Sequence, residues 1–144
     1  MHRRSFYVDS NIWLNLFKKE GNPDKEIPYW KIAQDFVNMC ELSDNVIVYT
    51  GFVLRELRFD LINENIYGKA LYLLKKFTYI KSISSDYEFA RQLESAFEYK
   101  ISFFDCMHIA ICKRLNLILI TRDKLLIEYG IKYIQIYKPE DLFF

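Results

Sequence analysis

Four acidic residues stand where a strand or a helix is expected to begin or end, in largely apolar surroundings. They are Asp9, Glu56, Asp105 and Asp123. Asp9 follows the apolar run Phe6–Val8, and Asp105 lies within the mostly apolar segment Phe103–Ala110. A carboxylate held among apolar residues is costly unless it is neutralised, paired or bound to a cation. Because several such carboxylates in one fold can share a divalent metal, the pattern points to metal-assisted phosphoester chemistry.

The elements that must position these residues alternate between strands and helices. Strands are expected at residues 5–8, 46–49, within 77–83, at 117–120 and at 132–136. Helices are expected at residues 12–17, 29–42, from 50 to about 61, at 67–76, from about 84 to 97, at 103–115 and at 124–128. This alternation predicts a parallel sheet covered by helices on both faces, in one α/β domain spanning residues 1–144.

Ligands of open parallel sheets bind beyond the carboxyl ends of the strands. Asp9 and Asp123 come just after two expected strands. Glu56 falls about one and a half turns into the helix that Thr50 begins, and Asp105 falls in the first turn of its own helix. We therefore expect all four carboxylates to face one crevice.

Composition narrows the class of protein. The 144 residues are 51% hydrophobic and 27% charged, with four glycines and three prolines, which is typical of one globular domain without a flexible linker. A net charge of +1 requires any nucleic acid to bind through a local basic patch. The three cysteines lack paired spacing, so buried reduced thiols and a cytoplasmic location are expected. No signal segment or membrane span is recognisable, which predicts a soluble protein.

Four motifs then match a known family in order and spacing. The segment Tyr7–Trp13 carries a D-x-N pattern at the end of the first strand, and Thr50–Leu57 places a glutamate in the helix after the second. Phe104–Ala110 is similar to a D-A-x-I-A-A pattern, and Ile120–Asp123 to a strand that ends in T-x-D. The chain resembles PIN domains, the metal-dependent ribonucleases that include the VapC-type toxins of prokaryotic toxin–antitoxin pairs.

This resemblance implies a three-layer α/β/α sandwich with a central five-stranded parallel sheet. It also implies that Asp9, Glu56, Asp105 and Asp123 bind Mg²⁺ or Mn²⁺ and hydrolyse RNA, with support by hydrogen bonds from Ser10, Asn11 and Thr121. Mg²⁺ prefers oxygen ligands, and a second ion would let one activate water while the other stabilises the leaving oxygen. We expect Asp9 and Asp105 to be the primary ligands, Glu56 a ligand or a base that orients water, and Asp123 an outer ligand. The chain departs from the family pattern at Cys106, where alanine is usual, and at His108, where an aliphatic residue is common.

Each acidic residue also has a purely structural interpretation. Asp9 and Asp123 are placed to cap helices, Glu56 to lie on a solvated face, and Asp105 to form a salt bridge. For His108, one turn after Asp105, a packed or hydrogen-bonded core histidine is the favoured interpretation. A phosphatase with an aspartyl nucleophile would need a second aspartate where Asn11 stands. A receiver-type phosphorylation switch would need an acceptor aspartate after the mid-chain strand, where Thr50 stands.

The expected binding partners of this chain are inferred mainly from the resemblance to VapC-type toxins. It implies that the chain forms homodimers and that an antitoxin covers the acidic pocket. The apolar C-terminal segment Asp141–Phe144 is compatible with a subunit interface or with packing onto its own domain. RNA phosphates have candidate partners in or near the motifs: Arg55, Arg58, Lys113, Arg114 and Arg122. Two other functions stay open: a PIN nuclease of RNA processing outside a toxin pair, and a non-catalytic PIN-fold module that binds RNA or protein.

Overall fold

The sheet is built from short strands that all run in the same direction. In the computed structural model, which describes residues 3–143, they are β1 (Ser5–Val8), β2 (Val46–Tyr49), β3 (Thr78–Tyr79), β4 (Ile118–Ile120) and β5 (Ile136–Tyr137). Their order is β3-β2-β1-β4-β5, and every pairing is parallel. The central strand β1 is apolar on both faces because both faces are covered, and Phe6, Tyr7 and Val8 are fully buried.

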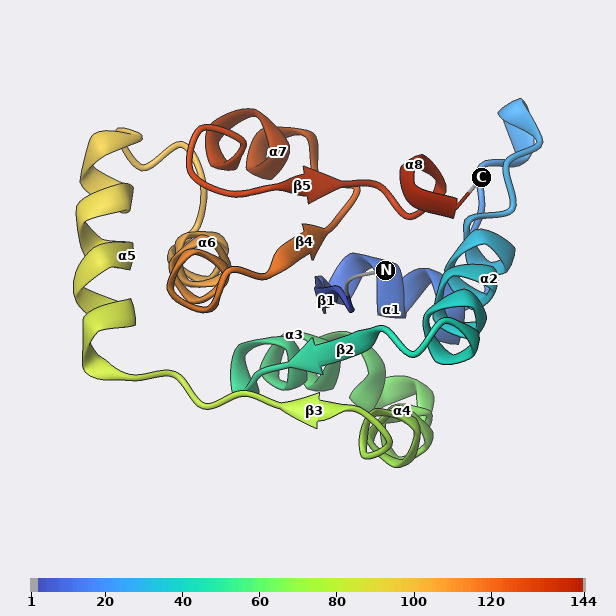
Figure 1. Cartoon of the computed structure of the whole chain (residues 1–144). Coiled ribbons are helices and arrows are strands. Elements are labelled where there is room, and N and C mark those ends of the chain that lie inside the picture. Colours follow the sequence, from blue (N-terminus) through green and yellow to red (C-terminus); the bar gives the residue numbers. More distant parts are fainter. Residues whose placement is uncertain (1–2, 144) are drawn as a thin grey trace.

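Helices connect the strands and cover the sheet on both sides (Figure 1). Over the described residues the α-helices are α1 (Ser10–Phe17), α2 (Tyr29–Leu42), α3 (Gly51–Leu61), α4 (Tyr67–Leu74), α5 (Ser84–Ala96), α6 (Phe103–Leu115), α7 (Lys124–Gly130) and α8 (Glu140–Phe143). Short 3₁₀ turns lie at Pro23–Lys25 and Ile62–Glu64. In Figure 1, α5 and α6 pack together at one side, while α2 and α8 lie together at the other. The predicted three-layer α/β/α sandwich with a five-stranded parallel sheet is confirmed.

The strands that follow β1 in the chain lie on both sides of it in the sheet: β2 and β3 on one side, β4 and β5 on the other. From β1 the chain moves to β2 and then to β3, and it then crosses back, through α5 and α6, to β4 on the other side of β1. In an open parallel sheet, such a switch point leaves a crevice at the carboxyl ends of the two neighbouring strands. The residues that follow β1 and β4 therefore lie at the place where this fold can bind a ligand.

One strand prediction is wrong. A final strand was expected at residues 132–136, but β5 begins only at Ile136. The backbone N–H groups of Tyr133 and Ile134 both donate to the carbonyl of Gly130, so a turn that continues from α7 occupies this segment. The β-branched and aromatic residues that suggested a strand are used there for packing against the core instead. Helix α8 was not anticipated. None of the helices within residues 3–143 is long and apolar enough to span a membrane.

An ion pair between the buried Asp86 and the partly exposed side chain of Arg114 joins α5 to α6, the helix that carries Asp105 and His108. The Asp86 carboxylate, 2% exposed, accepts hydrogen bonds from Arg114 Nε at 2.8 Å and Nη2 at 2.9 Å. It also accepts one from the backbone N–H of Ile83, which caps the start of α5. This bidentate geometry is the strong form of a carboxylate–guanidinium contact. Asp86 therefore holds α6 against α5 while it completes the first turn of α5.

We predict that Asp86→Ala lowers the free energy of unfolding by about 2 kcal/mol, because it leaves Arg114 without its partner and removes a cap. Chemical denaturation measures this change. Glu88→Ala, at an exposed position of the same helix, is the matched control and should change stability by less than about 0.5 kcal/mol. Equal effects of the two substitutions would contradict the assigned role of Asp86.

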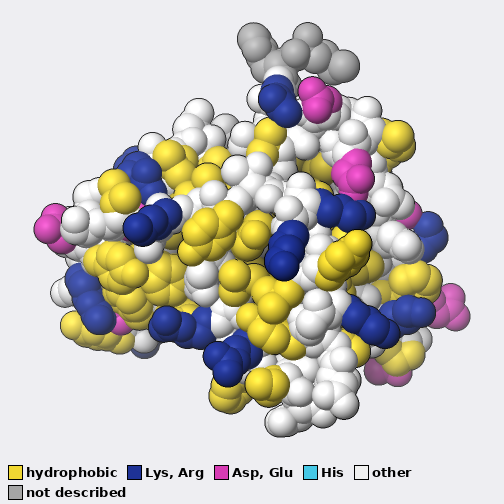
Figure 2. Space-filling model, turned by 90° about the horizontal axis from the view of Figure 1, so that it is seen from below, with side chains coloured by type: hydrophobic (Ala, Val, Ile, Leu, Met, Phe, Trp, Pro, Cys, Tyr) yellow, Lys and Arg dark blue, Asp and Glu magenta, His cyan; other side chains and the backbone are white. Residues whose placement is uncertain are grey.

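The side of the molecule that carries β3 and α4 is apolar and basic. Figure 2 looks at this side and shows hydrophobic side chains interleaved with Lys and Arg, with the visible acidic groups mostly toward the edge of the view. Large hydrophobic residues are exposed on α4 (Tyr72) and β3 (Tyr79), and also on α3 (Phe59), which contacts α4, and on the 3₁₀ turn that follows α3 (Ile62). We call these four residues the β3-side surface. Exposed apolar area of this kind is typical of binding surfaces.

Candidate active site

Asp9 stands at the switch point, immediately after β1. Its backbone is extended, and it caps α1 by accepting a hydrogen bond from the N–H of Ser10 at 2.7 Å. The other carboxylate oxygen accepts hydrogen bonds from Thr121 Oγ1 at 2.8 Å and Asn11 Nδ2 at 3.3 Å. Asp9 is only 4% exposed, and burial raises the pKa of its carboxyl group, with the nearby Glu56 charge acting in the same direction and His108 in the opposite one.

Thr121 links β4 to β1 at this point. Asn11 Nδ2 donates to Thr121 Oγ1 at 2.9 Å, and the backbone N–H of Asp123 donates to the same oxygen at 3.1 Å. The amide oxygen of Asn11 in turn accepts from the backbone N–H of Arg122. Asn11 and Thr121 thus bond to one another and to Asp9, in the supporting position that the motifs predict. Ser10 contributes its backbone N–H, whereas its hydroxyl lies 3.5 Å from Asp9 Oδ1, at the limit of a hydrogen bond.

Glu56 reaches the same crevice from α3. Thr50 caps the start of this helix, and its hydroxyl oxygen accepts a hydrogen bond from the N–H of Val53. The Glu56 side chain is 26% exposed, and its Oε1 lies 3.0 Å from His108 Nε2. A carboxylate that contacts a buried ring and is still reached by solvent can meet both a bound cation and an incoming water molecule.

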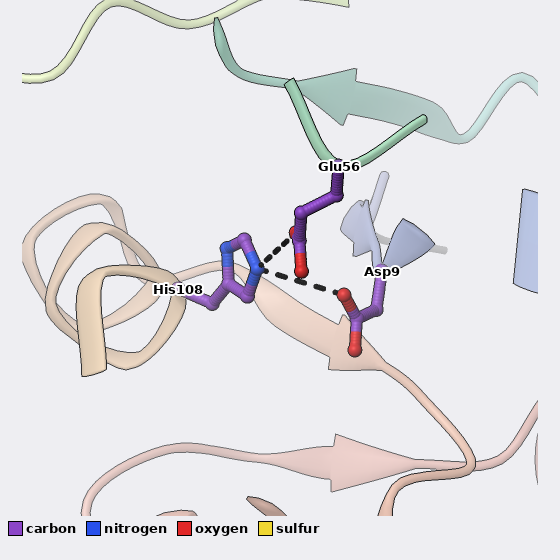
Figure 3. A group of neighbouring side chains, drawn as sticks. All are labelled: Asp9, Glu56 and His108. Carbon is purple, nitrogen blue, oxygen red and sulfur yellow. Dashed lines mark hydrogen bonds and ion pairs between the residues drawn. The ribbon is translucent and has the colours of Figure 1, made fainter. Parts of the chain in front are cut away.

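His108 faces both carboxylates from one side, with the same ring nitrogen directed at each of them (Figure 3). Its imidazole is fully buried, and Nε2 is 3.6 Å from Asp9 Oδ1 as well as 3.0 Å from Glu56 Oε1. On the other side of the ring, Nδ1 is 2.6 Å from the Tyr7 hydroxyl, which is 2.7 Å from the Thr50 hydroxyl. A buried, hydrogen-bonded histidine was the favoured interpretation, but its partners prove to be residues of the acidic crevice.

The negative surroundings change the acidity of His108. Burial by itself would lower the pKa of the imidazole, but the hydrogen bond that its Nε2–H donates to Glu56 and the charges of Asp9, Glu56 and Asp105 outweigh it and raise the pKa to about 9. In the absence of a metal ion, the ring is therefore a cation at neutral pH. The crevice attracts positive charge strongly enough to keep a buried imidazole protonated.

Asp105 lies one turn before His108 on α6. Its backbone N–H donates to the Ser102 hydroxyl, which caps the helix. Burial, together with the charges of Asp9, Asp123 and Glu56, raises the pKa of the Asp105 carboxyl to about 6, with His108 acting in the opposite direction. Among the residues described, none donates a hydrogen bond to this carboxylate. Asp105 therefore adds unneutralised charge to the crevice.

Asp123 has a structural role that the sequence allowed for. It caps α7, and its Oδ1 accepts hydrogen bonds from the N–H groups of Leu125 and Leu126 at 3.1 and 3.2 Å. Its charge nevertheless contributes to the raised pKa of Asp105. Asp123 is thus a helix cap at the margin of the crevice, close enough to act on the other carboxylates through its charge.

The donor set of the crevice fits a divalent cation. Atoms of Asp9, Glu56 and His108 lie within 4.8 Å of one another, with Asp105 electrostatically coupled to all three. Carboxylate oxygens are the ligands that Mg²⁺ and Mn²⁺ prefer. Three carboxylates, those of Asp9, Glu56 and Asp105, act on a single imidazolium, so an additional positive charge is favoured at this place.

The basic residues that the sequence suggested as partners of RNA phosphates do not lie on one common surface. Arg114 is held by Asp86, and Arg122 pairs with Glu140 at 2.8 Å while it lies over the ring of Tyr29. Lys113 lines a cavity with Arg3 and Ser5 near the start of β1, at the opposite end of the strand from Asp9. Arg55 lines a groove beside Glu56, and Arg58 is exposed in the last turn of α3. The guanidinium groups of Arg114 and Arg122 are thus engaged within the protein.

Comparison with known families assigns the fold. The family model described as PIN domain matches residues 6–132, which includes all four acidic positions. The chain belongs to the PIN domain family. The resemblance inferred from the four motifs is therefore confirmed. Comparison with curated protein sequences gave no match.

Solved structures similar to this PIN domain include one described as a toxin–antitoxin complex and two described as VapBC. A toxin–antitoxin complex from Klebsiella pneumoniae contains a chain that is 20% identical, with a TM-score of 0.69, over 92% of this chain and 96% of that chain. DNA-bound VapBC from Salmonella typhimurium has a TM-score of 0.70 at 12% identity, covering 94% and 98% of the two chains. VapBC-1 from nontypeable Haemophilus influenzae has a TM-score of 0.68 at 17% identity, with the same coverage. At these identities the likeness establishes the shared fold.

The raised pKa of His108 predicts how the stability of the metal-free PIN domain depends on pH. The folded protein holds a proton on His108 up to about pH 9, whereas the unfolded chain releases it near the ordinary value of 6.5. Stability from this group is therefore fully present below pH 6.5 and is lost as the pH rises through 9. We expect the melting temperature in EDTA to fall across this range.

The matched variant for this measurement is His108→Gln, which keeps a polar side chain but has no group that titrates in this range. Its melting temperature should fall less steeply between pH 6.5 and 9 than that of the unchanged protein. Parallel curves for the two proteins would show that His108 does not carry the proton.

Proposed function

We propose that this PIN domain is a divalent-cation-dependent endoribonuclease and the toxin of a toxin–antitoxin pair. The observation that carries the proposal is the convergence of Asp9 and Glu56 at the switch-point crevice, with the charge of Asp105 coupled to both and with no hydrogen bond donated to the Asp105 carboxylate within residues 3–143. Charge concentrated in this way serves to hold a cation against a substrate that is itself an anion. A phosphodiester is such a substrate.

In the proposed hydrolysis, the residues of the acidic crevice have separate roles in binding the cation, orienting its ligands and accepting a proton. Asp9, Glu56 and Asp105 would hold a divalent cation, and Asn11 and Thr121 fix the orientation of Asp9. When bound, the cation neutralises negative charge on the phosphate and lowers the pKa of water. Glu56, the more solvent-accessible of the carboxylates that contact His108, accepts a proton as water attacks phosphorus. The bond from phosphorus to the leaving ribose oxygen breaks, and that oxygen takes up a proton from solvent.

A groove beside Glu56 supports single-stranded RNA as the substrate. It has a volume of about 400 Å³ and is lined by Arg55, Glu56, Phe59, Asp60 and Phe104. Phe59 is 84% exposed, and the ring of Phe104 is held edge-on against Phe52 at 5.0 Å. Exposed aromatic faces stack unpaired bases, and a neighbouring guanidinium binds phosphate. The groove thus offers both contacts next to the acidic crevice.

A protein partner is supported by the solved relatives and by the exposed surface. The similar chains come from complexes described as toxin–antitoxin or VapBC. In this chain the β3-side surface leaves large apolar side chains uncovered, among them Tyr72, which is 78% exposed. We propose that an antitoxin covers the acidic crevice, that the chain forms homodimers and that it acts in the cytoplasm.

The decisive experiment is cleavage of labelled single-stranded RNA by the unchanged protein and by Asp105→Asn, each with Mn²⁺, Mg²⁺ or EDTA. We expect metal-dependent cleavage that falls by at least about a hundredfold in the variant. Because Asp105 is held among like charges, its neutralisation should also raise the stability of the metal-free protein, on the order of 1 kcal/mol or more at pH 8. A structural salt bridge at Asp105 would give the opposite change in stability.

Glu128→Gln, an exposed substitution on α7, is the matched control and should leave both activity and stability unchanged. Production of the active protein in a bacterial host should arrest growth, and Asp105→Asn at equal abundance should not. Equal cleavage by Asp105→Asn and the unchanged protein would overturn the assignment of the site. Metal binding without cleavage of any RNA would identify a non-catalytic binding module, and cleavage without growth arrest would favour a nuclease of RNA processing.

We predict that Phe59→Ala weakens the binding of single-stranded RNA about tenfold, because one base loses its stacking surface. Fluorescence anisotropy with a short labelled RNA measures this affinity. Tyr72→Ala, at a similarly exposed aromatic residue on α4, is the control and should bind RNA as the unchanged protein does. The groove would be excluded as the RNA site if the two variants behaved alike.

A further inference from the structure

His108 is not accounted for by the four carboxylates of the proposed nuclease site, although it lies at their centre. Its ring nitrogen Nε2 faces Asp9 Oδ1 at 3.6 Å and Glu56 Oε1 at 3.0 Å, and the imidazole is fully buried. We propose that His108 Nε2 is a direct ligand of the divalent cation, which gives this site a nitrogen donor among oxygen donors. The inference rests on the proposed function, because it concerns the same cation.

The spacing of the donor atoms suits a shared ion. Ligands about 2.1 Å from an octahedral ion lie roughly 3 Å apart when adjacent and roughly 4.2 Å apart when opposite. The two distances from His108 Nε2 fall within this interval, and donor atoms of all three residues lie within 4.8 Å of one another. Asp9 directly follows β1, and Glu56 and His108 lie on α3 and α6, elements whose relative positions are set by the core. The backbone therefore already places the nitrogen where a ligand is needed.

The far side of the ring is organised as it is in histidine ligands of metals. Such a histidine uses one nitrogen for the ion and the other for a hydrogen bond that fixes the ring and its tautomer. Here Nδ1 is 2.6 Å from the Tyr7 hydroxyl, and that hydroxyl is 2.7 Å from Thr50 Oγ1. When a cation takes the place of the proton on Nε2, Nδ1–H donates to Tyr7 and Tyr7 O–H donates to Thr50, so the lone pair of Nε2 is free to bind that cation beside Asp9 and Glu56.

Tyr7 is suited to this task because it cannot readily lose its proton. Burial raises the pKa of its hydroxyl well above the usual value, and the charges of Asp9 and Glu56 act in the same direction. The phenol therefore stays neutral and available as an acceptor for Nδ1–H. Tyr7 and Thr50 are positioning residues for His108 and do not reach the cation themselves.

A nitrogen ligand changes which ions the site prefers. Imidazole favours the later first-row transition metals, whereas Mg²⁺ is bound by oxygen and exchanges water reluctantly. We expect His108→Gln to lower the affinity for Co²⁺ by at least about tenfold and the affinity for Mg²⁺ by less than about threefold. Isothermal titration calorimetry of the full chain with each metal chloride measures both values. Equal losses for the two ions would overturn the inference.

The direct test is pulsed electron paramagnetic resonance of Mn²⁺ bound to the full chain, free of any affinity tag. The spectrum should contain the coupling of a directly bound ¹⁴N nucleus, and this coupling should change to that of ¹⁵N when the histidines alone carry ¹⁵N. It should be absent from His108→Gln, which still contains His2, and present in Tyr7→Phe, with Mn²⁺ affinity reduced about tenfold. The labelling experiment needs no substitution, so it does not depend on the folding of a variant.

Two kinds of failure are distinguishable. If Mn²⁺ binds, Asp9→Asn abolishes binding, and histidine labelling leaves the spectrum unchanged, the acidic site stands and His108 is not a ligand. If the unchanged protein binds no Mn²⁺, or Asp9→Asn binds it equally well, the proposed metal site itself is wrong.

Discussion

The concentration of negative charge at the carboxyl ends of β1 and β4 is the constraint on which the rest of the site depends. Asp9 is almost completely buried, and Glu56 and Asp105 approach it from two different helices. Folding brings these groups together at a cost, because burial and mutual repulsion both oppose the charged forms. The same cost provides the affinity for a cation, so a site of this kind is necessarily less stable when it is empty.

The surrounding structure moderates this charge in two ways. Neutral donors hold Asp9 in one orientation: Thr121 and Asn11 bond to one oxygen, and the backbone of Ser10 bonds to the other. His108 supplies the nearest positive charge and is itself held by Tyr7. Beneath this arrangement, the pair Asp86–Arg114 fixes α6 against α5, so that His108 and Asp105 keep their places.

Much of this arrangement could be predicted from the sequence because it depends on local signals. Asp9 and Thr121 each follow an apolar strand directly, and parallel strands that neighbour one another bring such residues together. The links among Tyr7, Thr50 and His108 could not be predicted, since they join residues 43 and 101 positions apart and depend on side-chain packing. The prediction of a strand at residues 132–136 was wrong for a related reason. Hydrogen bonds to the carbonyl of Gly130 hold that segment in a turn, and the hydrophobic pattern of the sequence does not reveal them.

The measurement that tests the account most directly is the position of Mn²⁺ in a crystal of this PIN domain, located by its anomalous scattering. The account predicts a single strong peak in the crevice between β1 and β4, within bonding distance of the carboxylates of Asp9 and Glu56. A crystal soaked in Mn²⁺ that showed no peak there, with Asp9 and Glu56 still paired only to His108, would contradict it.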